Sequence, residues 1–446
     1  MGKGTGAALL AIHAMTLTGA AIPASAPVSP PSTAQPASPL AAPVAPAAAS
    51  QPANPAGAPA AAASSNAKLP TAGEIRAGVL RVDTPTLPPA SRLDLPPPDL
   101  GLVGAELATR DNATTGGFLG QTFTTETATA TPQDAVAKLE RLIDGGSAFI
   151  VVMADDAQTL ALADAARAKA GDKVLILNAL AEGDDLRGDD CRANVIHVAA
   201  SRAMKSDALA QFLMWKRWGK WYLVEGSHPR DKALAAAYAR AATKFGAKLV
   251  ETREFTDTGG GRRTDTGYVQ IQQQMPVFTQ RAPGHDVLVA ADEAGTFAPY
   301  LPYQTWDARP VVGSAGLTPV TWHPAAEAWG GTQLQTRFEA LAHRPMREAD
   351  YQVWLALRLL GEAASRAPST DFAALRDRLL GPQFEVGAFK GQKLTIRDWD
   401  HQLRQPILLA TPAIVASVSP QDQYLHQTSA LDTLGIDRPE STCKLK

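Results

Sequence analysis

Cysteine is scarce in this sequence, with two residues in 446. Two cysteines cannot build a disulfide-dense scaffold or a four-cysteine zinc site. Charge of one sign is not in excess either: 42 Lys plus Arg face 44 Asp plus Glu, giving a formal net charge of −2. That balance argues against a nucleic-acid-binding protein, which usually carries a basic face. No run of about 20 apolar residues occurs, so we expect no helix that spans a membrane.

The motifs of common metal- and nucleophile-dependent enzymes are also missing. HExxH, CxxC, GxSxG and GxxxxGK[ST] do not occur. Residues 259–263 read Gly-Gly-Gly-Arg-Arg, but their spacing is wrong for a phosphate-binding loop, so we interpret them as a surface loop. We therefore predict that the protein is not an enzyme and has no catalytic residues. A hydrolase stays open as an alternative, because catalytic groups can assemble in space without a local motif.

The first 70 residues differ in composition from the rest. Residues 1–26 fit a secretory signal peptide, with Lys3, an apolar stretch and the small residues Ala24-Ser25-Ala26 at the cleavage site. Residues 27–70 are rich in proline and alanine and carry one charge, on Lys68, so they cannot form a packed core. We predict a cleaved signal peptide, a disordered linker and a periplasmic protein.

From about residue 77, apolar strands alternate with helices. Residues 149–153 form a continuous apolar run, typical of a parallel strand buried on both faces. This alternation predicts parallel sheets with right-handed crossovers, and the cycle restarts near residue 220. We also expect a short helix over 293–301 and a β pair formed by 393–399 and 405–409.

The predicted fold class is therefore α/β, with two doubly wound parallel-sheet lobes joined by hinge strands. Lobe 1 comprises 77–201 and 335–420, lobe 2 comprises 220–317, and 421–446 form a C-terminal tail. Hinge crossings are expected near 201–221, 317–321 and 330–349.

The signal peptide and the tandem lobes resemble a type I periplasmic binding protein of the Leu/Ile/Val-binding class, over roughly 77–420. The resemblance implies a non-catalytic receptor that closes over a small-molecule or ion ligand and works with an ABC permease and ATPase. It further implies a monomer. The charge balance and the lack of a long apolar run predict, as above, no nucleic-acid partner and no membrane span. A periplasmic sensor or an accessory protein without transport is the alternative within the same fold.

Several segments carry a sharper resemblance, to the ABC-transporter substrate-binding protein that accompanies PQQ-dependent alcohol dehydrogenase systems. That group overlaps with periplasmic components implicated in lanthanide utilisation. The segments are 190–195, 201–204, 321–324, 388–406 and 425–441.

The sequence departs from amino-acid-binding members of the class, which place small hydroxyl residues after the third and fourth strands. Here the third strand ends in Met153-Ala154-Asp155-Asp156, and the fourth runs into Asn178-Ala179-Leu180-Ala181-Glu182. Acidic residues would repel a carboxylate. A branched-chain amino acid is therefore not the expected ligand.

The candidate ligand-binding residues follow from the rule that ligands bind beyond the carboxyl ends of parallel strands. Lobe 1 places four acidic residues there: Asp83, Asp155, Asp156 and Glu182. Lobe 2 contributes Glu225, Ser227, His228, Asp292 and Glu293. Converging carboxylates would repel one another unless a positive group lies between them. No cofactor is expected, but a hard cation such as a lanthanide or calcium, or a cationic solute, would fit these oxygen ligands.

Two other interpretations of these residues remain. Asp155, Asp156, Asp292 and Glu293 stand at expected helix starts, where acidic side chains cap amides and interact favourably with the helix dipole. A neutral or aromatic solute could instead use Arg202, Trp322 and His323 near the hinge.

The two cysteines allow one pairing. An oxidising periplasm permits a disulfide, so we predict a Cys191–Cys443 bond that ties the C-terminal tail to lobe 1.

Overall fold

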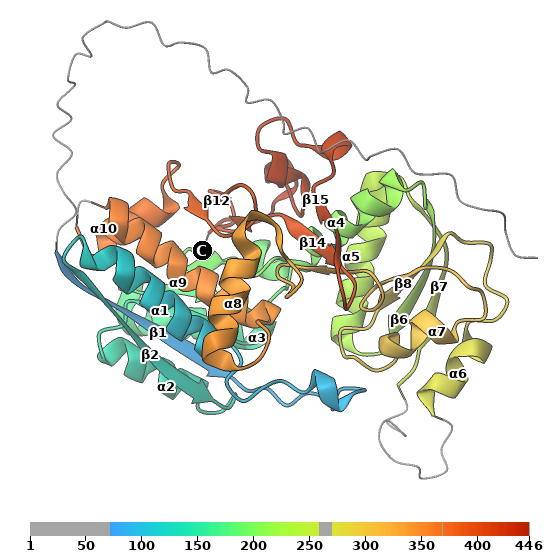
Figure 1. Cartoon of the computed structure of the whole chain (residues 1–446), viewed down its shortest axis with the longest axis horizontal. Coiled ribbons are helices and arrows are strands. Elements are labelled where there is room, and N and C mark those ends of the chain that lie inside the picture. The colour runs from blue at the N-terminus through green and yellow to red at the C-terminus, as the bar shows by residue number, and fades with distance from the viewer. Residues whose placement is uncertain (1–71, 258–269, 368, 446) are drawn as a thin grey trace, which may run out of the picture. The chain divides into compact units, whose positions relative to one another are not determined.

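The computed structural model describes residues 72–257, 270–367 and 369–445 (Figure 1). The predicted signal peptide 1–26, the predicted linker 27–70 and the expected loop at 259–263 lie outside the described residues. All described residues fall within one unit of the chain, Asn66–Lys446. In the described ranges, no helix combines the length and the apolar character needed to cross a membrane.

The first sheet has five parallel strands in the order β2-β1-β3-β4-β5. Its strands are β1 (Gly73–Val82), β2 (Gln121–Ala130), β3 (Phe149–Met153), β4 (Leu175–Asn178) and β5 (Val195–His197). The helices that cover it are α1 (Leu102–Gly117), α2 (Ala135–Asp144), α3 (Asp156–Ala170) and α9 (Glu348–Arg366). Residues of α1 and α9 share a core with one face, and residues of α2 and α3 with the other. Every residue of β3 is buried, as its apolar run predicts.

The second sheet has four parallel strands in the order β7-β6-β8-β9. Its strands are β6 (Lys220–Gly226), β7 (Lys248–Phe255), β8 (Val287–Ala291) and β9 (Val311–Gly313). Its helices are α4 (Arg202–Trp215), α5 (Pro229–Phe245), α6 (Ile271–Phe278) and α7 (Leu301–Gln304). Helices α4 and α5 share a core with one face, and α6 and α7 with the other.

Local sequence explains where α5 begins and ends. Pro229 occupies the first turn, where its missing N–H costs nothing, and Asp231 accepts a hydrogen bond from the backbone N–H of His228 at 3.2 Å. The helix ends at Gly246, whose φ of 79° suits a residue without a side chain. The start of α5 is thereby fixed at the carboxyl end of β6.

The C-terminal third of the chain returns to both sheets. Helices α8 (Gly331–Ala342), α9 and α10 (Phe372–Leu380) join the core of the first sheet. Long-range hydrogen bonds hold α9 there: Asn112 donates to the Leu357 carbonyl and Gln121 to the Ala364 carbonyl, both at 2.9 Å. Figure 1 shows α1 and α9 side by side.

A three-stranded antiparallel sheet, β10-β14-β15, follows a different pattern from the sequence expectation. Its strands are β10 (Thr318–Val320), β14 (Ile407–Ala410) and β15 (Val415–Ser419). The expected pairing of 405–409 with 393–399 is wrong, because β12 (Lys393–Ile396) pairs instead with β11 (Val386–Gly387) and β13 (Leu403–Arg404). Ile407 and Leu409 pack in the core of the second sheet, although 335–420 was predicted to belong to lobe 1. Both side chains are buried against the apolar residues of that core.

The expected helix over 293–301 starts too early. Residues after β8 form a turn, and the helical conformation begins with a 3₁₀ helix at Ala298–Tyr300 (η4), followed by α7. The Asp292 carboxylate accepts hydrogen bonds from the amides of Thr296, Phe297 and Ala298, at 2.7–2.8 Å. A side chain therefore satisfies these amides where helical carbonyls would otherwise do so.

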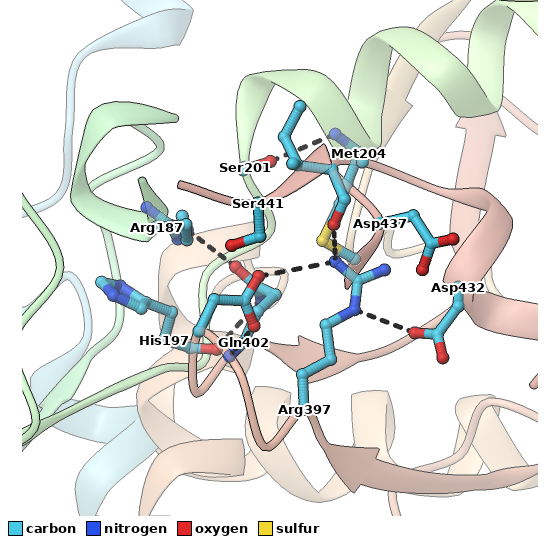
Figure 2. A network of polar contacts seen from close by, with 12 residues as sticks. Arg187, His197, Ser201, Met204, Arg397, Gln402, Asp432, Asp437 and Ser441 are labelled. Carbon is cyan, nitrogen blue, oxygen red and sulfur yellow. Dashed lines mark hydrogen bonds and ion pairs between the residues drawn. The ribbon is translucent and has the colours of Figure 1, made fainter. Parts of the chain in front are cut away.

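The C-terminal tail is tied down by charge and by covalent chemistry. The predicted Cys191–Cys443 disulfide is confirmed. The guanidinium of Arg397 donates to Asp432 in the tail at 2.9 Å, while Gln402 accepts from Arg187 at 2.7 Å and donates to the His197 carbonyl at 3.0 Å (Figure 2). One segment of chain thus links the tail to the end of the first sheet.

Candidate ligand-binding site

A cavity of about 890 Å³ lies at the carboxyl ends of β1, β3 and β4. Its walls come from the end of β1 and the proline-rich segment after it, from the start of α3, and from the loop after β4. Four further residues of the wall come from elements of the second sheet. They are Arg202 and Lys205 on α4, Arg230 on α5, and Glu293 after β8. The position agrees with the general rule for open α/β sheets.

Half of the twelve predicted ligand-binding residues line this cavity. They are Asp83, Asp155, Asp156, Glu182, Arg202 and Glu293. The other six do not line it: Glu225, Ser227, His228, Asp292, Trp322 and His323.

Arg202 joins two carboxylates that belong to different sheets. Its guanidinium donates to Glu293 at 2.6 and 2.7 Å and to Asp156 at 2.9 Å. Ser201 caps α4 and so places Arg202 on the first helical residue. Burial acts to raise the pKa of Asp156, but the charge and hydrogen bond of Arg202 hold that pKa below its usual value. The same carboxylates raise the pKa of Arg202.

Lys205, one turn further along α4, bridges a second pair of carboxylates. Its ammonium lies 2.5 Å from Glu182 and 3.0 Å from Glu348 at the start of α9. Burial raises the pKa of Glu182 to about 7. Despite its burial, the pKa of Glu348 is lowered by Lys205 and by the hydrogen bonds from Thr321. The two acids are therefore unequal, with Glu348 the more firmly ionised partner.

Behind this pair lies a buried amine, that of Lys390. Its ammonium donates to the carbonyls of Thr321 and Pro406, and burial lowers its pKa to about 7. The backbone carbonyl of Thr321 thus accepts a hydrogen bond from Lys390, and its backbone amide donates one to Glu348. The segment after β10 is held by two charged side chains at once.

The two remaining acidic residues of the cavity have local partners. Asp83 accepts two hydrogen bonds from Arg81, at 2.8 and 3.0 Å. Asp155 caps α3 by accepting from the Gln158 amide at 2.8 Å, and it also accepts from the Thr84 hydroxyl at 3.0 Å. Capping, one of the two interpretations offered from the sequence, describes the contacts of Asp155.

The predicted residues outside the cavity each have another contact. Glu225 pairs with Lys232 at 2.7 Å, and Asp292 accepts from the turn amides described above. The His228 ring contacts the Asp257 carboxylate at 2.9 Å, and the Ser227 hydroxyl accepts a hydrogen bond from the backbone amide of Asp257 at 3.0 Å. These four residues lie at the carboxyl ends of strands in the second sheet, but their side chains contact neighbouring parts of that sheet's own loops and helices.

The two aromatic hinge candidates are also placed. Trp322 is buried in the core of the first sheet and stacks on Tyr351, with ring centroids 4.7 Å apart. His323 is half-buried and accepts from the Ala325 amide at 3.1 Å; burial lowers its pKa. Neither side chain contributes to the cavity wall.

No group of three or more His, Cys, Asp or Glu residues suited to a metal ion occurs in the described part of the chain. Four of the five acidic residues of the cavity, all but Asp155, instead have one of the protein's own basic groups beside them, Arg81, Arg202 or Lys205. A bound lanthanide or calcium ion stays a prediction.

Several wall residues were not singled out from the sequence. They are Lys205, Arg230, Thr84, Thr86, Leu100, Leu180 and the prolines 96–98. One signal could have found Arg230. A cation in the first turn of a helix interacts unfavourably with the helix dipole, which suggests that the residue has a function other than stabilising the helix. The proline-rich segment also follows the carboxyl end of a predicted strand, the place where ligand-binding loops begin.

Comparison with known proteins gives the same architecture. The family model described as periplasmic binding protein matches residues 100–275. No curated protein matches the chain. A branched-chain amino acid ABC transporter periplasmic ligand-binding protein from Burkholderia xenovorans has a TM-score of 0.63 and 16% identity, over 83% of this chain and 99% of that one.

Two further solved structures are similar to the same extent. An ABC transporter substrate-binding protein from Desulfitobacterium hafniense in complex with Leu has a TM-score of 0.60 and 16% identity, covering 78% of this chain and all of the other. A solute-binding protein from R. palustris in complex with benzoate has a TM-score of 0.58 and 14% identity, covering 84% of this chain and all of the other. The chain therefore has the α/β fold of the type I periplasmic binding proteins, and its residues 100–275 match the periplasmic binding protein family.

Proposed function

We propose that this protein is the periplasmic solute-binding component of an ABC transporter and binds a small ligand in the cavity without chemical turnover. The observation that carries the proposal is the cavity itself. It lies at the carboxyl ends of three parallel strands, and side chains from the second sheet complete its wall. Its volume of about 890 Å³ is in the upper part of the roughly 300–1,000 Å³ range of small-molecule sites.

The contacts of Arg202 support closure over a ligand. A single guanidinium holds Asp156, beside the first sheet, and Glu293, beside the second. Hinge closure brings such groups together and opening separates them. A permease and an ATPase are the partners that this function requires.

A finer proposal concerns the pathway. The segments 190–195, 201–204, 321–324, 388–406 and 425–441 support a receptor that serves PQQ-dependent alcohol oxidation, with PQQ, its alcohol or aldehyde substrates, or a lanthanide ion as candidate ligands.

The experiment is a thermal-shift screen of the purified protein, followed by calorimetry. The panel contains leucine, benzoate, PQQ, short alcohols and aldehydes, and lanthanide and calcium ions. A ligand present at 100 times its Kd stabilises the folded state by about 2.7 kcal/mol, so one panel member is expected to raise the Tm. Product analysis of the same mixture is expected to find the ligand unchanged.

Two outcomes contradict the proposals separately. Turnover of a bound compound, or no shift with any panel member, removes the receptor function. A shift with leucine or benzoate and none with PQQ, the alcohols, the aldehydes or the ions keeps the receptor but removes the link to alcohol oxidation.

A further inference from the structure

We infer that the cavity takes a ligand with one anionic group and an apolar body, and that Arg230 binds the anion. This inference rests on the proposed function and adds the chemical class of the ligand. It follows from which charged groups in the wall are already engaged.

The acidic side chains of the wall have partners within the protein. Asp83 has Arg81, Asp156 and Glu293 share Arg202, and Glu182 has Lys205. Asp155 has two neutral donors at the start of α3, the end of the helix where a negative charge is favourable. At four of these five carboxylates, all but Asp155, an entering ammonium group would therefore compete with a basic side chain of the protein itself.

The basic side chains of the wall differ in whether they have a partner within the protein. Four of them line the cavity: Arg81, Lys205, Arg202 and Arg230. Arg81 donates to Asp83 and to the carbonyl of Pro98 at 2.6 Å, while Arg202 and Lys205 each bridge two carboxylates. Within the described part of the chain, Arg230 alone of the four has no hydrogen-bond or ion-pair partner, and it is exposed.

The position of Arg230 adds to its charge. It is the second residue of α5 and so stands in the first turn of that helix, where the backbone dipole favours an anion and where Asp231 already caps the helix start. A guanidinium can hold a carboxylate through two parallel hydrogen bonds. Thr86, an exposed residue that also lines the cavity, offers one further donor in its hydroxyl.

The rest of the wall is apolar. The prolines 96–98, Leu100, Met153 and Leu180 line it, and Leu180 keeps 40% of its surface exposed. An apolar body placed against these residues would remove this surface from water, which is favourable. With about 890 Å³ available, the body can be larger than the side chain of leucine.

The test uses four probes that share one body and differ in charge: 2-naphthoate, 2-naphthalenemethanol, 2-naphthylmethylamine and 3-(2-naphthyl)alanine. Calorimetry on the full chain is expected to give at least tenfold tighter binding for 2-naphthoate than for any of the others. Arg230→Gln is expected to weaken 2-naphthoate at least tenfold, and Arg230→Lys less than Arg230→Gln. Arg141→Gln, the same change at an exposed arginine on α2 away from the cavity, is expected to bind like the parent.

Three results would overturn the inference: tighter binding of the amine or of the zwitterion, unchanged binding of 2-naphthoate by Arg230→Gln, and binding of none of the four probes. The receptor function is judged by the wider screen on the same preparation. A shift there with any other ligand keeps the receptor after the anion assignment has failed, and no shift anywhere removes both.

Discussion

Helix α4 contributes to two clusters of six charged side chains, which have opposite charge ratios and different surroundings. The cavity cluster consists of Arg202 and Lys205 with Asp156, Glu182, Glu293 and Glu348. The tail cluster consists of Asp207 and Asp432 with Arg240, Lys244, Arg397 and Arg404. Both hold together parts of the chain that are far apart in sequence.

The difference lies in the access of water to the carboxylates. Side-chain exposure is 0% for Asp207 and 4% for Asp432, against 39% for Asp156 and 29% for Glu293. A carboxylate that loses its partner in the tail cluster stays dry and uncompensated, whereas one in the cavity cluster can be hydrated or can exchange partners. The tail cluster is therefore a structural fastening, and the cavity cluster is suited to change with ligand or with closure.

The largest effect is expected from the disulfide beside the tail cluster. The bond closes a loop with a sequence separation of 252 residues, for which the chain-entropy model gives about 5.5 kcal/mol of stabilisation. The double substitution Cys191→Ser/Cys443→Ser should lower the free energy of unfolding in urea by up to this amount. Reduction of the parent protein should give the same loss, and an unchanged Tm after either treatment would show that the noncovalent tail contacts suffice.

Within the tail cluster, Arg397→Met is expected to cost about 3 kcal/mol, because it leaves buried acceptors without a donor. Arg397 is 1% exposed and donates to Asp432 and to the carbonyls of Leu434 and Ile436. Urea denaturation measures the loss.

Arg438→Met is the matched control, since Arg438 also lies over the ring of Trp399 but pairs with exposed Asp398. Exposed pairs contribute about 0–1 kcal/mol, so this variant should be nearly as stable as the parent. Equal losses in the two variants would mean that the ring contact, rather than the burial of Asp432, sets the stability.

The sequence predicts the two sheets well for a physical reason. A continuous apolar run such as residues 149–153 is a local signal, and the structure has β3 at Phe149–Met153, the expected bounds. Strand pairing is not local. Residues 405–409 and 393–399 are separated by a short polar segment typical of a hairpin, yet β14 pairs with β10 and β15 because its apolar side chains fit the second core.

The candidate site shows the same limit at the level of side chains. The strand-end rule located Asp83, Asp155, Asp156 and Glu182, because all follow strands of one sheet. It does not say which way a side chain turns, so it also selected Glu225, which turns to Lys232 on α5. It passed over Lys205 and Arg230, which stand on helices and reach the cavity only through the arrangement of the two sheets.

The substitution of Lys390 is expected to change the free energy of unfolding by less than the substitution of Arg397. The Lys390 side chain is buried, and its pKa of about 7 is lower than in the unfolded chain. Between pH 7 and 10 the unfolded chain therefore binds more protons at this residue than the folded protein, and stability rises with pH by up to about 1.4 kcal/mol per pH unit. Lys390→Met should reduce the rise in unfolding free energy between pH 7 and 9 by about 2 kcal/mol.

Lys393→Met provides the control for this slope. Lys393 is 71% exposed and pairs with Glu385, so its removal should leave the pH dependence of unfolding unchanged. A slope that persists in Lys390→Met would assign the pH dependence to other groups.

The smallest effect on stability is expected from the substitution of Arg202, although its ion pairs matter most for the proposed function. Arg202→Met should cost about 1 kcal/mol, because Asp156 and Glu293 can both reach water once the guanidinium is gone. Arg202→Met/Glu293→Gln should recover part of that loss, since it removes one of the two unpaired charges. What the substitution should change is the balance of conformations: without the bridge, the radius of gyration from small-angle scattering should rise in the ligand-free protein and fall when a ligand of the screen is added. A loss as large as that of Arg397→Met, with no change in scattering, would make the cavity cluster a second structural fastening and erase the difference between the two clusters.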